Sequence, residues 1–131
     1  MNAVRKSYLE TLVEKFRLKK VKKIITGGSN TQESKLKALT ALQELCAPDD
    51  IVLLHDAVRP LITEKLIADN IASVKKYGSA VTAVPFTETA IVSEKGETTE
   101  KTIVRNTLYI AKAPQSFYFK DALEAHTKGE E

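Results

Sequence analysis

Apolar and polar positions along the chain follow two periods, one typical of helices and one typical of strands. Apolar residues recur every three or four positions in three long segments, which predicts amphipathic helices. These helices cover residues 3–19, 32–46 and 64–77, and a short fourth helix is expected over 119–126. Strands are predicted over residues 22–26, 51–55, 79–85 and 108–113. Such alternation indicates an α/β fold with a doubly wound, mainly parallel sheet joined by right-handed crossovers.

The ends of the third helix carry their own signals. Thr63 precedes the helix and has a side chain suited to accept a hydrogen bond from its first turn. Gly78 follows the helix and can take up the left-handed conformation in which helices often end. These two residues predict that this helix begins at residue 64 and ends at residue 77.

The second predicted strand leads directly into candidate chemistry. Residues 51–54 are all apolar, which is typical of a strand buried on both faces in a parallel sheet. His55 and Asp56 follow, so the carboxylate of Asp56 would lie at the carboxyl end of that strand, where open α/β sheets bind ligands. With Arg59 three residues further on, this edge suits a divalent metal and a phosphate.

A polar segment interrupts the α/β pattern over residues 86–106. It has too few apolar residues for a core, and residues 94–97 predict a hairpin turn. We therefore expect a projecting two-stranded arm, which needs something to pack on because a lone hairpin is marginally stable.

Composition narrows the classes of protein that remain. The chain has 131 residues, 43% hydrophobic and 28% charged, which fits one globular domain with its own core. No apolar run approaches the roughly 18 residues of a membrane span, and the first ten residues lack a signal-peptide core. Cys46 is the single cysteine, which excludes an internal disulfide and fits a reducing cytoplasm. We expect a cytoplasmic protein with no membrane partner and Cys46 in the core.

Basic residues cluster before the second predicted helix. A basic run is usually a solvated face, and this one lacks the interleaved aromatic residues that stack on nucleic acids. The cluster consists of Arg17, Lys19, Lys20, Lys22 and Lys23, within a chain of formal net charge +3. We therefore expect no nucleic-acid partner.

Two further motifs have both a functional and a structural interpretation. Gly27 and Gly28, followed by Ser34, could let a ligand approach the backbone at a helix start, although turn chemistry alone explains a glycine pair. Arg105 at the base of the arm could bind a phosphate with two hydrogen bonds, or form a surface ion pair. For His55 and His126 a structural role is expected rather than a catalytic one, because histidines in such positions are more often structural.

Taken in order, these segments resemble one family over nearly the whole chain. The chain is similar to the cytidylyltransferases that act on polyol phosphates. These include the 2-C-methyl-D-erythritol 4-phosphate enzyme of isoprenoid synthesis and the ribitol 5-phosphate enzyme of teichoic-acid synthesis. The resemblance lies in Gly27–Ser34, His55–Thr63, Val81–Pro85, Glu88 with Thr89, Arg105, and Pro114–Phe117. It implies an incomplete Rossmann-like nucleotidyltransferase domain over residues 1–131.

The resemblance also implies roles for individual residues. Gly28 and Ser34 would contact the cytosine of CTP, Ala57 the ribose through its backbone, and Asp56 the Mg²⁺ that bridges the phosphates. Thr89 and Arg105 would bind the polyol phosphate. The family exchanges its arm between two subunits, so these two residues would serve the partner's site in a homodimer. The chemistry needs positioned phosphates and neutralised charge rather than a catalytic nucleophile of the protein.

The sequence also departs from the family pattern. It lacks the opening glycine-rich loop with an arginine and a lysine, and the second metal-binding aspartate near the end of the pattern. Thr31, Lys35 and Ala113 replace an arginine, a small apolar residue and a threonine. We expect the isolated chain to be inactive and to self-associate. Residues 93–96 in the arm and Pro114–Phe117 resemble the ribitol-phosphate branch of the family slightly more than the other. The alternatives are a non-catalytic α/β oligomerisation or binding module derived from the family, or an α/β domain whose motifs serve packing and turns.

Overall fold

The computed structural model describes residues 3–129 of the chain. The chain divides into two compact units. Unit 1 comprises Met1–Val52 and Phe117–Glu131, and unit 2 comprises Leu53–Ser116. The helices are α1 (Ala3–Lys15), α2 (Thr31–Leu42), α3 (Glu64–Tyr77) and α4 (Phe119–Lys128), with one 3-10 turn, η1 (Arg105–Thr107). The strands are β1 (Ile51–Leu54), β2 (Ser79–Pro85), β3 (Ile91–Val92), β4 (Lys101–Thr102) and β5 (Tyr109–Tyr118).

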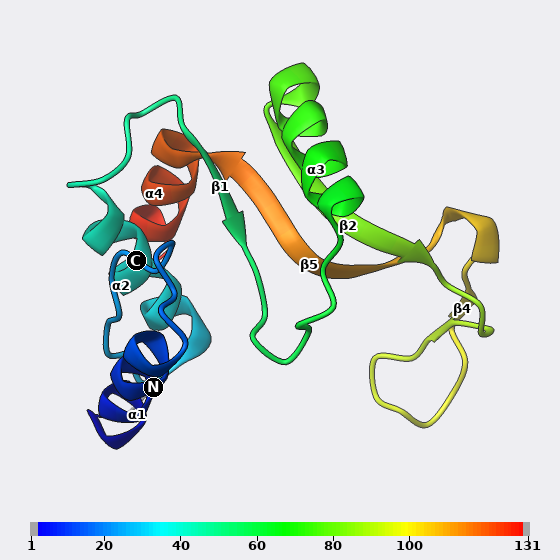
Figure 1. The fold of residues 1–131 in the computed structure, drawn as a ribbon. Coiled ribbons are helices and arrows are strands. Elements are labelled where there is room, and N and C mark those ends of the chain that lie inside the picture. The colour runs from blue at the N-terminus through cyan, green and yellow to red at the C-terminus, as the bar shows by residue number, and fades with distance from the viewer. Residues whose placement is uncertain (1–2, 130–131) are drawn as a thin grey trace. The chain divides into compact units, whose positions relative to one another are not determined.

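Unit 1 is built around the packing of α2 on α4 (Figure 1). Leu39 of α2 is completely buried, and Phe119 and Ala122 of α4 are buried as well. Unit 1 therefore has a small apolar core between these two helices.

His126 of α4 is half-buried, and its Nδ1 atom has no hydrogen-bond partner. Burial, together with the nearby charge of Lys35, lowers the pKa of His126.

Unit 2 is built around α3, which lies along β2 (Figure 1). The hydroxyl of Thr63 accepts a hydrogen bond from the Leu66 N–H at 3.2 Å, so the predicted start of α3 is confirmed. Gly78 has φ 86°, a left-handed conformation, and its N–H donates to the Val74 carbonyl at 2.8 Å. The predicted end of α3 is confirmed too, and Val74 is completely buried.

A three-stranded sheet has the order β1-β5-β2, and β1 and β5 each run through both units. Phe86, just after β2, donates its N–H to Leu108, just before β5. Phe119, just after β5, donates its N–H to Asp50, just before β1. The end of one strand thus lies beside the start of the other in both pairs, so β5 runs opposite to β1 and β2. In Figure 1 the arrowheads of β2 and β5 point in opposite directions. The sequence pattern did not predict this antiparallel central strand.

The structure corrects several predicted boundaries. Residues 22–26 form no strand, because none of the strands in the described chain pairs with them. The first two helices each end four residues earlier than predicted, at Lys15 and Leu42, and the second begins one residue earlier, at Thr31. The strand predicted over 108–113 extends to Tyr118. Within β1 only Val52 is buried, so the expectation of a strand buried on both faces is wrong for this structure, where β1 is an edge strand of the three-stranded sheet.

The segment predicted as an arm contains a second, two-stranded sheet. Strands β3 and β4 pair antiparallel, with Ile91 opposite Thr102 and Val92 opposite Lys101. The Glu100 N–H donates to the Val92 carbonyl at 2.9 Å, and the Ile103 N–H donates to the Ala90 carbonyl at 3.2 Å. The connection is broader than the predicted hairpin turn at 94–97, since the strands end at residue 92 and resume at residue 101.

Candidate functional site

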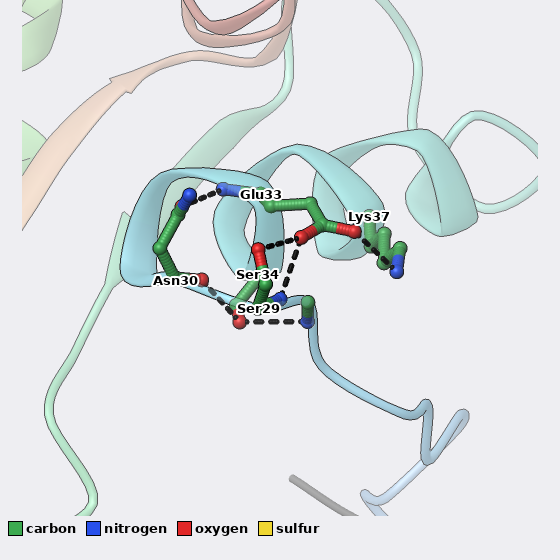
Figure 2. A network of polar contacts seen from close by, with 6 residues as sticks. Ser29, Asn30, Glu33, Ser34 and Lys37 are labelled. Carbon is green, nitrogen blue, oxygen red and sulfur yellow. Dashed lines mark hydrogen bonds and ion pairs between the residues drawn. The ribbon is translucent and has the colours of Figure 1, made fainter.

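The glycine turn before α2 is held by side chains of that helix (Figure 2). The Gly28 N–H donates to Ser34 Oγ at 2.9 Å, and the Ser34 hydroxyl donates to the Asn30 carbonyl at 2.8 Å. Asn30 caps the helix, because its Oδ1 accepts the Glu33 N–H at 2.8 Å. The structure therefore brings Gly28 and Ser34 into direct contact.

Glu33 adds a second set of contacts to the same turn. One oxygen, Oε2, accepts the Ser29 N–H at 2.5 Å and the Ser29 hydroxyl at 2.7 Å. The other, Oε1, lies 2.7 Å from Lys37 Nζ. The hydrogen bonds from Lys37 and Ser29 lower the pKa of Glu33 to about 2. Glu33 is therefore ionised at neutral pH and anchors the backbone of the turn.

The loop after β1 places Asp56 and Arg59 side by side. Arg59 Nε donates to Asp56 Oδ2 at 3.0 Å, and the Arg59 N–H donates to the Asp56 carbonyl at the same distance. A hydrogen bond of 2.7 Å joins His55 Nε2 to the Arg59 carbonyl. His55 thus has a structural role in this turn. The Asp56 side chain is 56% exposed and the Ala57 residue is exposed, so both are accessible from solvent.

Asp56 fits a magnesium ion only in company with phosphate ligands. Mg²⁺ at nucleotide sites is usually held by one or two carboxylates together with substrate phosphates and water. No cluster of three or more His, Cys, Asp or Glu side chains suited to a metal ion occurs within residues 3–129. One accessible carboxylate, beside an arginine that could contact the same phosphates, is compatible with that mode of binding.

The base of the arm brings together Thr89 and Arg105, which are 16 residues apart. One terminal nitrogen of Arg105 donates to Thr89 Oγ1 at 3.3 Å, and both residues are exposed. Arg105 also lines a surface hollow of about 510 Å³. The other lining residues are Pro85, Phe86, Val104, Asn106 and Leu108. A guanidinium that lines a hollow beside a hydroxyl can bind a phosphate ester with several hydrogen bonds.

The predicted site residues therefore fall into three local groups. Gly28 and Ser34 belong to unit 1, whereas the groups of Asp56 with Ala57 and of Thr89 with Arg105 belong to unit 2. The sequence reasoning missed Glu33, although an acidic residue three positions after an N-cap is a known helix-start signal.

One motif of the resemblance has a structural explanation. Ser116, in the stretch Pro114–Phe117, is completely buried in β5, and its hydroxyl donates to Asn70 Oδ1 at 2.9 Å. Asn70 Nδ2 donates in turn to the Leu66 carbonyl at 2.9 Å and to Thr82 Oγ1 at 3.2 Å. This network joins α3, β2 and β5 in the interior of unit 2, so Ser116 stabilises the fold rather than contacting a ligand.

Comparison with known proteins identifies the family. The family model described as IspD, 2-C-methyl-D-erythritol 4-phosphate cytidylyltransferase, matches residues 2–131. This chain belongs to the IspD family. The resemblance inferred from the sequence motifs is therefore confirmed over nearly the whole chain.

The curated relatives are named for one of two acceptor substrates, ribitol 5-phosphate or 2-C-methyl-D-erythritol 4-phosphate. A ribitol-5-phosphate cytidylyltransferase from Streptococcus agalactiae serotype Ia is 47% identical over 116 residues, covering 88% of this chain and 48% of the relative. A 2-C-methyl-D-erythritol 4-phosphate cytidylyltransferase from Clostridium acetobutylicum is 34% identical over 122 residues, covering 93% of this chain and 52% of the relative. The chain thus spans about half the length of these curated relatives.

Solved IspD structures share the fold. The 2-C-methyl-D-erythritol 4-phosphate cytidylyltransferase of Francisella tularensis has a TM-score of 0.71 at 26% identity, covering 85% of this chain and 52% of that one. The predicted Rossmann-like α/β class is therefore confirmed. Among the helices of residues 3–129, none is both long and apolar enough to cross a membrane.

Proposed function

We propose that this chain takes part in CTP-dependent cytidylyl transfer to a polyol phosphate, with ribitol 5-phosphate as the preferred acceptor. The observation that carries the proposal is the contact of Arg105 with Thr89 beside the hollow at the base of the arm. The preference for ribitol is supported by 47% identity to a relative named for that substrate, against 34% for one named for methylerythritol phosphate.

In this reaction a phosphate oxygen of the polyol phosphate attacks the α-phosphorus of CTP. A new P–O bond forms, the bond from the α-phosphorus to the bridging oxygen breaks, and pyrophosphate leaves. Arg105 would hold the acceptor phosphate, because a guanidinium keeps its charge at any physiological pH and can donate two parallel hydrogen bonds. Thr89 would add a hydroxyl contact and fix the orientation of the guanidinium.

The nucleotide would be bound by the other two groups of residues. Gly28 and Ser34 would contact the cytosine, Ala57 the ribose, and Asp56 a Mg²⁺ ion on the phosphates. Bound Mg²⁺ would neutralise the charge of the triphosphate. The exposed Asp56 carboxylate and the backbone of the glycine turn support these assignments.

The isolated 131 residues are expected to turn over slowly or not at all. They do not contain the glycine-rich loop whose cationic groups stabilise the triphosphate, and loss of one preorganised group of this kind costs about a hundredfold or more in rate. We propose that the chain forms a homodimer through the arm over residues 86–106. Because activity is expected to be low, binding is the sharper test of the site.

Replacing Arg105 by alanine is expected to weaken the binding of ribitol 5-phosphate by at least about tenfold, because two charge-assisted hydrogen bonds are lost. Arg105→Lys should recover only part of the affinity, since an ammonium group cannot bind a phosphate with a planar fork. Isothermal titration calorimetry with ribitol 5-phosphate and with 2-C-methyl-D-erythritol 4-phosphate measures both effects and the acceptor preference.

The matched control is Lys101→Ala, which removes another exposed basic side chain from the same segment. Its affinity for ribitol 5-phosphate should equal that of the wild type. Equal affinity in wild type and Arg105→Ala would remove Arg105 from the site. A chain that self-associates in sedimentation experiments but binds neither CTP nor either polyol phosphate would instead support the non-catalytic module.

Asp56→Asn tests the proposed metal ligand. In the wild type, MgCl2 is expected to raise the affinity for CTP. In Asp56→Asn this increase in affinity should be roughly tenfold smaller, because a neutral amide is a poor ligand for Mg²⁺. CTP titrations with and without MgCl2 measure the difference. Asp69→Asn, at an exposed aspartate paired with Lys65 on α3, is the control and should keep the full gain. The same magnesium dependence in Asp56→Asn as in the wild type would exclude Asp56.

A further inference from the structure

Two consecutive backbone N–H groups of the glycine turn are bound by two consecutive side chains of α2 (Figure 2). Gly28 donates to Ser34 Oγ, and Ser29 donates to Glu33 Oε2. The Ser29 hydroxyl donates to the same carboxylate oxygen. The conformation of the turn therefore depends on how these two side chains are held on the helix.

The Glu33 carboxylate is held on its other side as well. Lys37 lies one helical turn further along α2, and its Nζ contacts Glu33 Oε1 at 2.7 Å. The Glu33 N–H is itself bound by the Asn30 cap at 2.8 Å. Each carboxylate oxygen thus has a donor, and the side chain is fixed between the helix and the turn.

Glu33 also explains why position 28 is a glycine. A Cβ atom added at Gly28 would overlap the Cβ, Cγ and Cδ atoms of Glu33. The backbone of Gly28 therefore packs directly against the Glu33 side chain. The Glu33 side chain therefore contacts the turn by close packing as well as by hydrogen bonds.

We propose that Glu33 is a positioning residue that holds the Gly28–Ser29 turn in place, and that this hold sets the affinity of the turn for CTP. The first half of the proposal rests on the contacts above, and the second half rests on the proposed function. Glu33 need not touch the nucleotide. It acts through Ser29 and Gly28, whereas Ser34 was already assigned to the cytosine by the family resemblance.

The test compares Glu33→Ala and the nearly isosteric Glu33→Gln with the wild type. Amide hydrogen exchange by NMR, recorded without nucleotide, reports the Ser29 N–H. Calorimetric titration reports the affinity for CTP. Glu33→Ala should raise the exchange rate at Ser29 by about tenfold and weaken CTP binding by a similar factor, as expected for loss of one hydrogen bond to a charged group. Glu33→Gln should give an exchange rate at Ser29 and an affinity for CTP between those of the wild type and Glu33→Ala, because it keeps an acceptor oxygen but loses the charge.

Glu44→Gln is the matched control. Glu44 also lies in unit 1 and forms an ion pair with a lysine, Lys23, with a distance of 2.8 Å from Oε2 to Nζ. It has no contact with the glycine turn among the hydrogen bonds and ion pairs of the described residues. Its replacement should leave both Ser29 exchange and CTP affinity unchanged, which separates the positioning effect from the general loss of an ion pair.

An unchanged amide exchange rate at Ser29 in both Glu33 variants would overturn the proposal, whatever their affinity for CTP. Faster exchange at Ser29 with unchanged CTP affinity would also overturn it, because the hold would then have no effect on binding. If the wild type does not bind CTP, the proposed nucleotide site fails. The exchange rates then still decide whether Glu33 holds the turn.

Discussion

Replacing Asn70 by alanine is expected to destabilise unit 2 by about 2–4 kcal/mol. The residue Asn70 is 5% exposed, and its side chain makes three hydrogen bonds, to Leu66, Thr82 and Ser116. Ser116 is completely buried, so its hydroxyl would lose its acceptor with no access to water. A buried polar group without a partner costs more than the net stabilisation of one hydrogen bond, which is why the effect is large.

Urea unfolding monitored by circular dichroism measures this effect, and a double-mutant cycle assigns it. Ser116→Ala alone should cost about 1–3 kcal/mol, because Asn70 keeps its two Nδ2 bonds, to Leu66 and Thr82, but its Oδ1 atom loses its donor. The double variant should be less destabilised than the sum of the two, since no orphaned hydroxyl remains at position 116. Asp69→Ala, an exposed neighbour on α3, serves as the control. A value for Asn70→Ala equal to that of Asp69→Ala would contradict the role of the network.

Asn70 also illustrates what the hydrophobic pattern leaves out. The apolar period of this helix favours an inner face made of Leu66, Ile67, Ile71 and Val74, and Val74 is completely buried. Asn70 lies four residues from both Leu66 and Val74, so it shares their face, but a polar residue does not register in an apolar count. Its position between two inward residues was the available signal.

Local signals were the most reliable part of the prediction. Thr63 and Gly78 defined α3 to the residue, because capping depends only on a few neighbouring atoms. A strand depends on a partner that is distant in sequence. Residues 22–26 have an apolar centre but no partner strand in the described chain, and the direction of β5 follows from which strands flank it.

In the candidate site, too, contacts between residues close in sequence could be predicted, and contacts between distant residues could not. Asp56 and Arg59 are three residues apart, so their contact could be expected from the sequence alone. Thr89 and Arg105 meet across the segment that contains the β3–β4 pairing, and only the family resemblance related them in advance. Glu33 was missed because the resemblance assigned roles to residues that contact ligands, and not to those that hold them in place.

Replacing Leu39 by alanine is expected to destabilise unit 1 by about 2–5 kcal/mol, through lost apolar burial and the cavity that remains. Leu39 is completely buried in α2, the helix that packs on α4, where Phe119 and Ala122 are also buried. Leu39→Met should cost less than about 1.5 kcal/mol, because it nearly conserves the volume. Leu45→Ala, at a leucine that is 52% exposed in the same unit, is the control and should cost less than either of the others.

The consequence of Leu39→Ala should reach the glycine turn, although Leu39 is in α2 and does not belong to the turn. Ser34 and Glu33 bind the Gly28 and Ser29 N–H groups from the first turns of α2, so transient opening of that helix also releases the turn. Amide exchange at Ser29 should therefore accelerate in step with exchange in α2, while α3 in unit 2 keeps its exchange rates. Acceleration in α2 without acceleration at Ser29 would show that the turn holds its conformation independently of the helix.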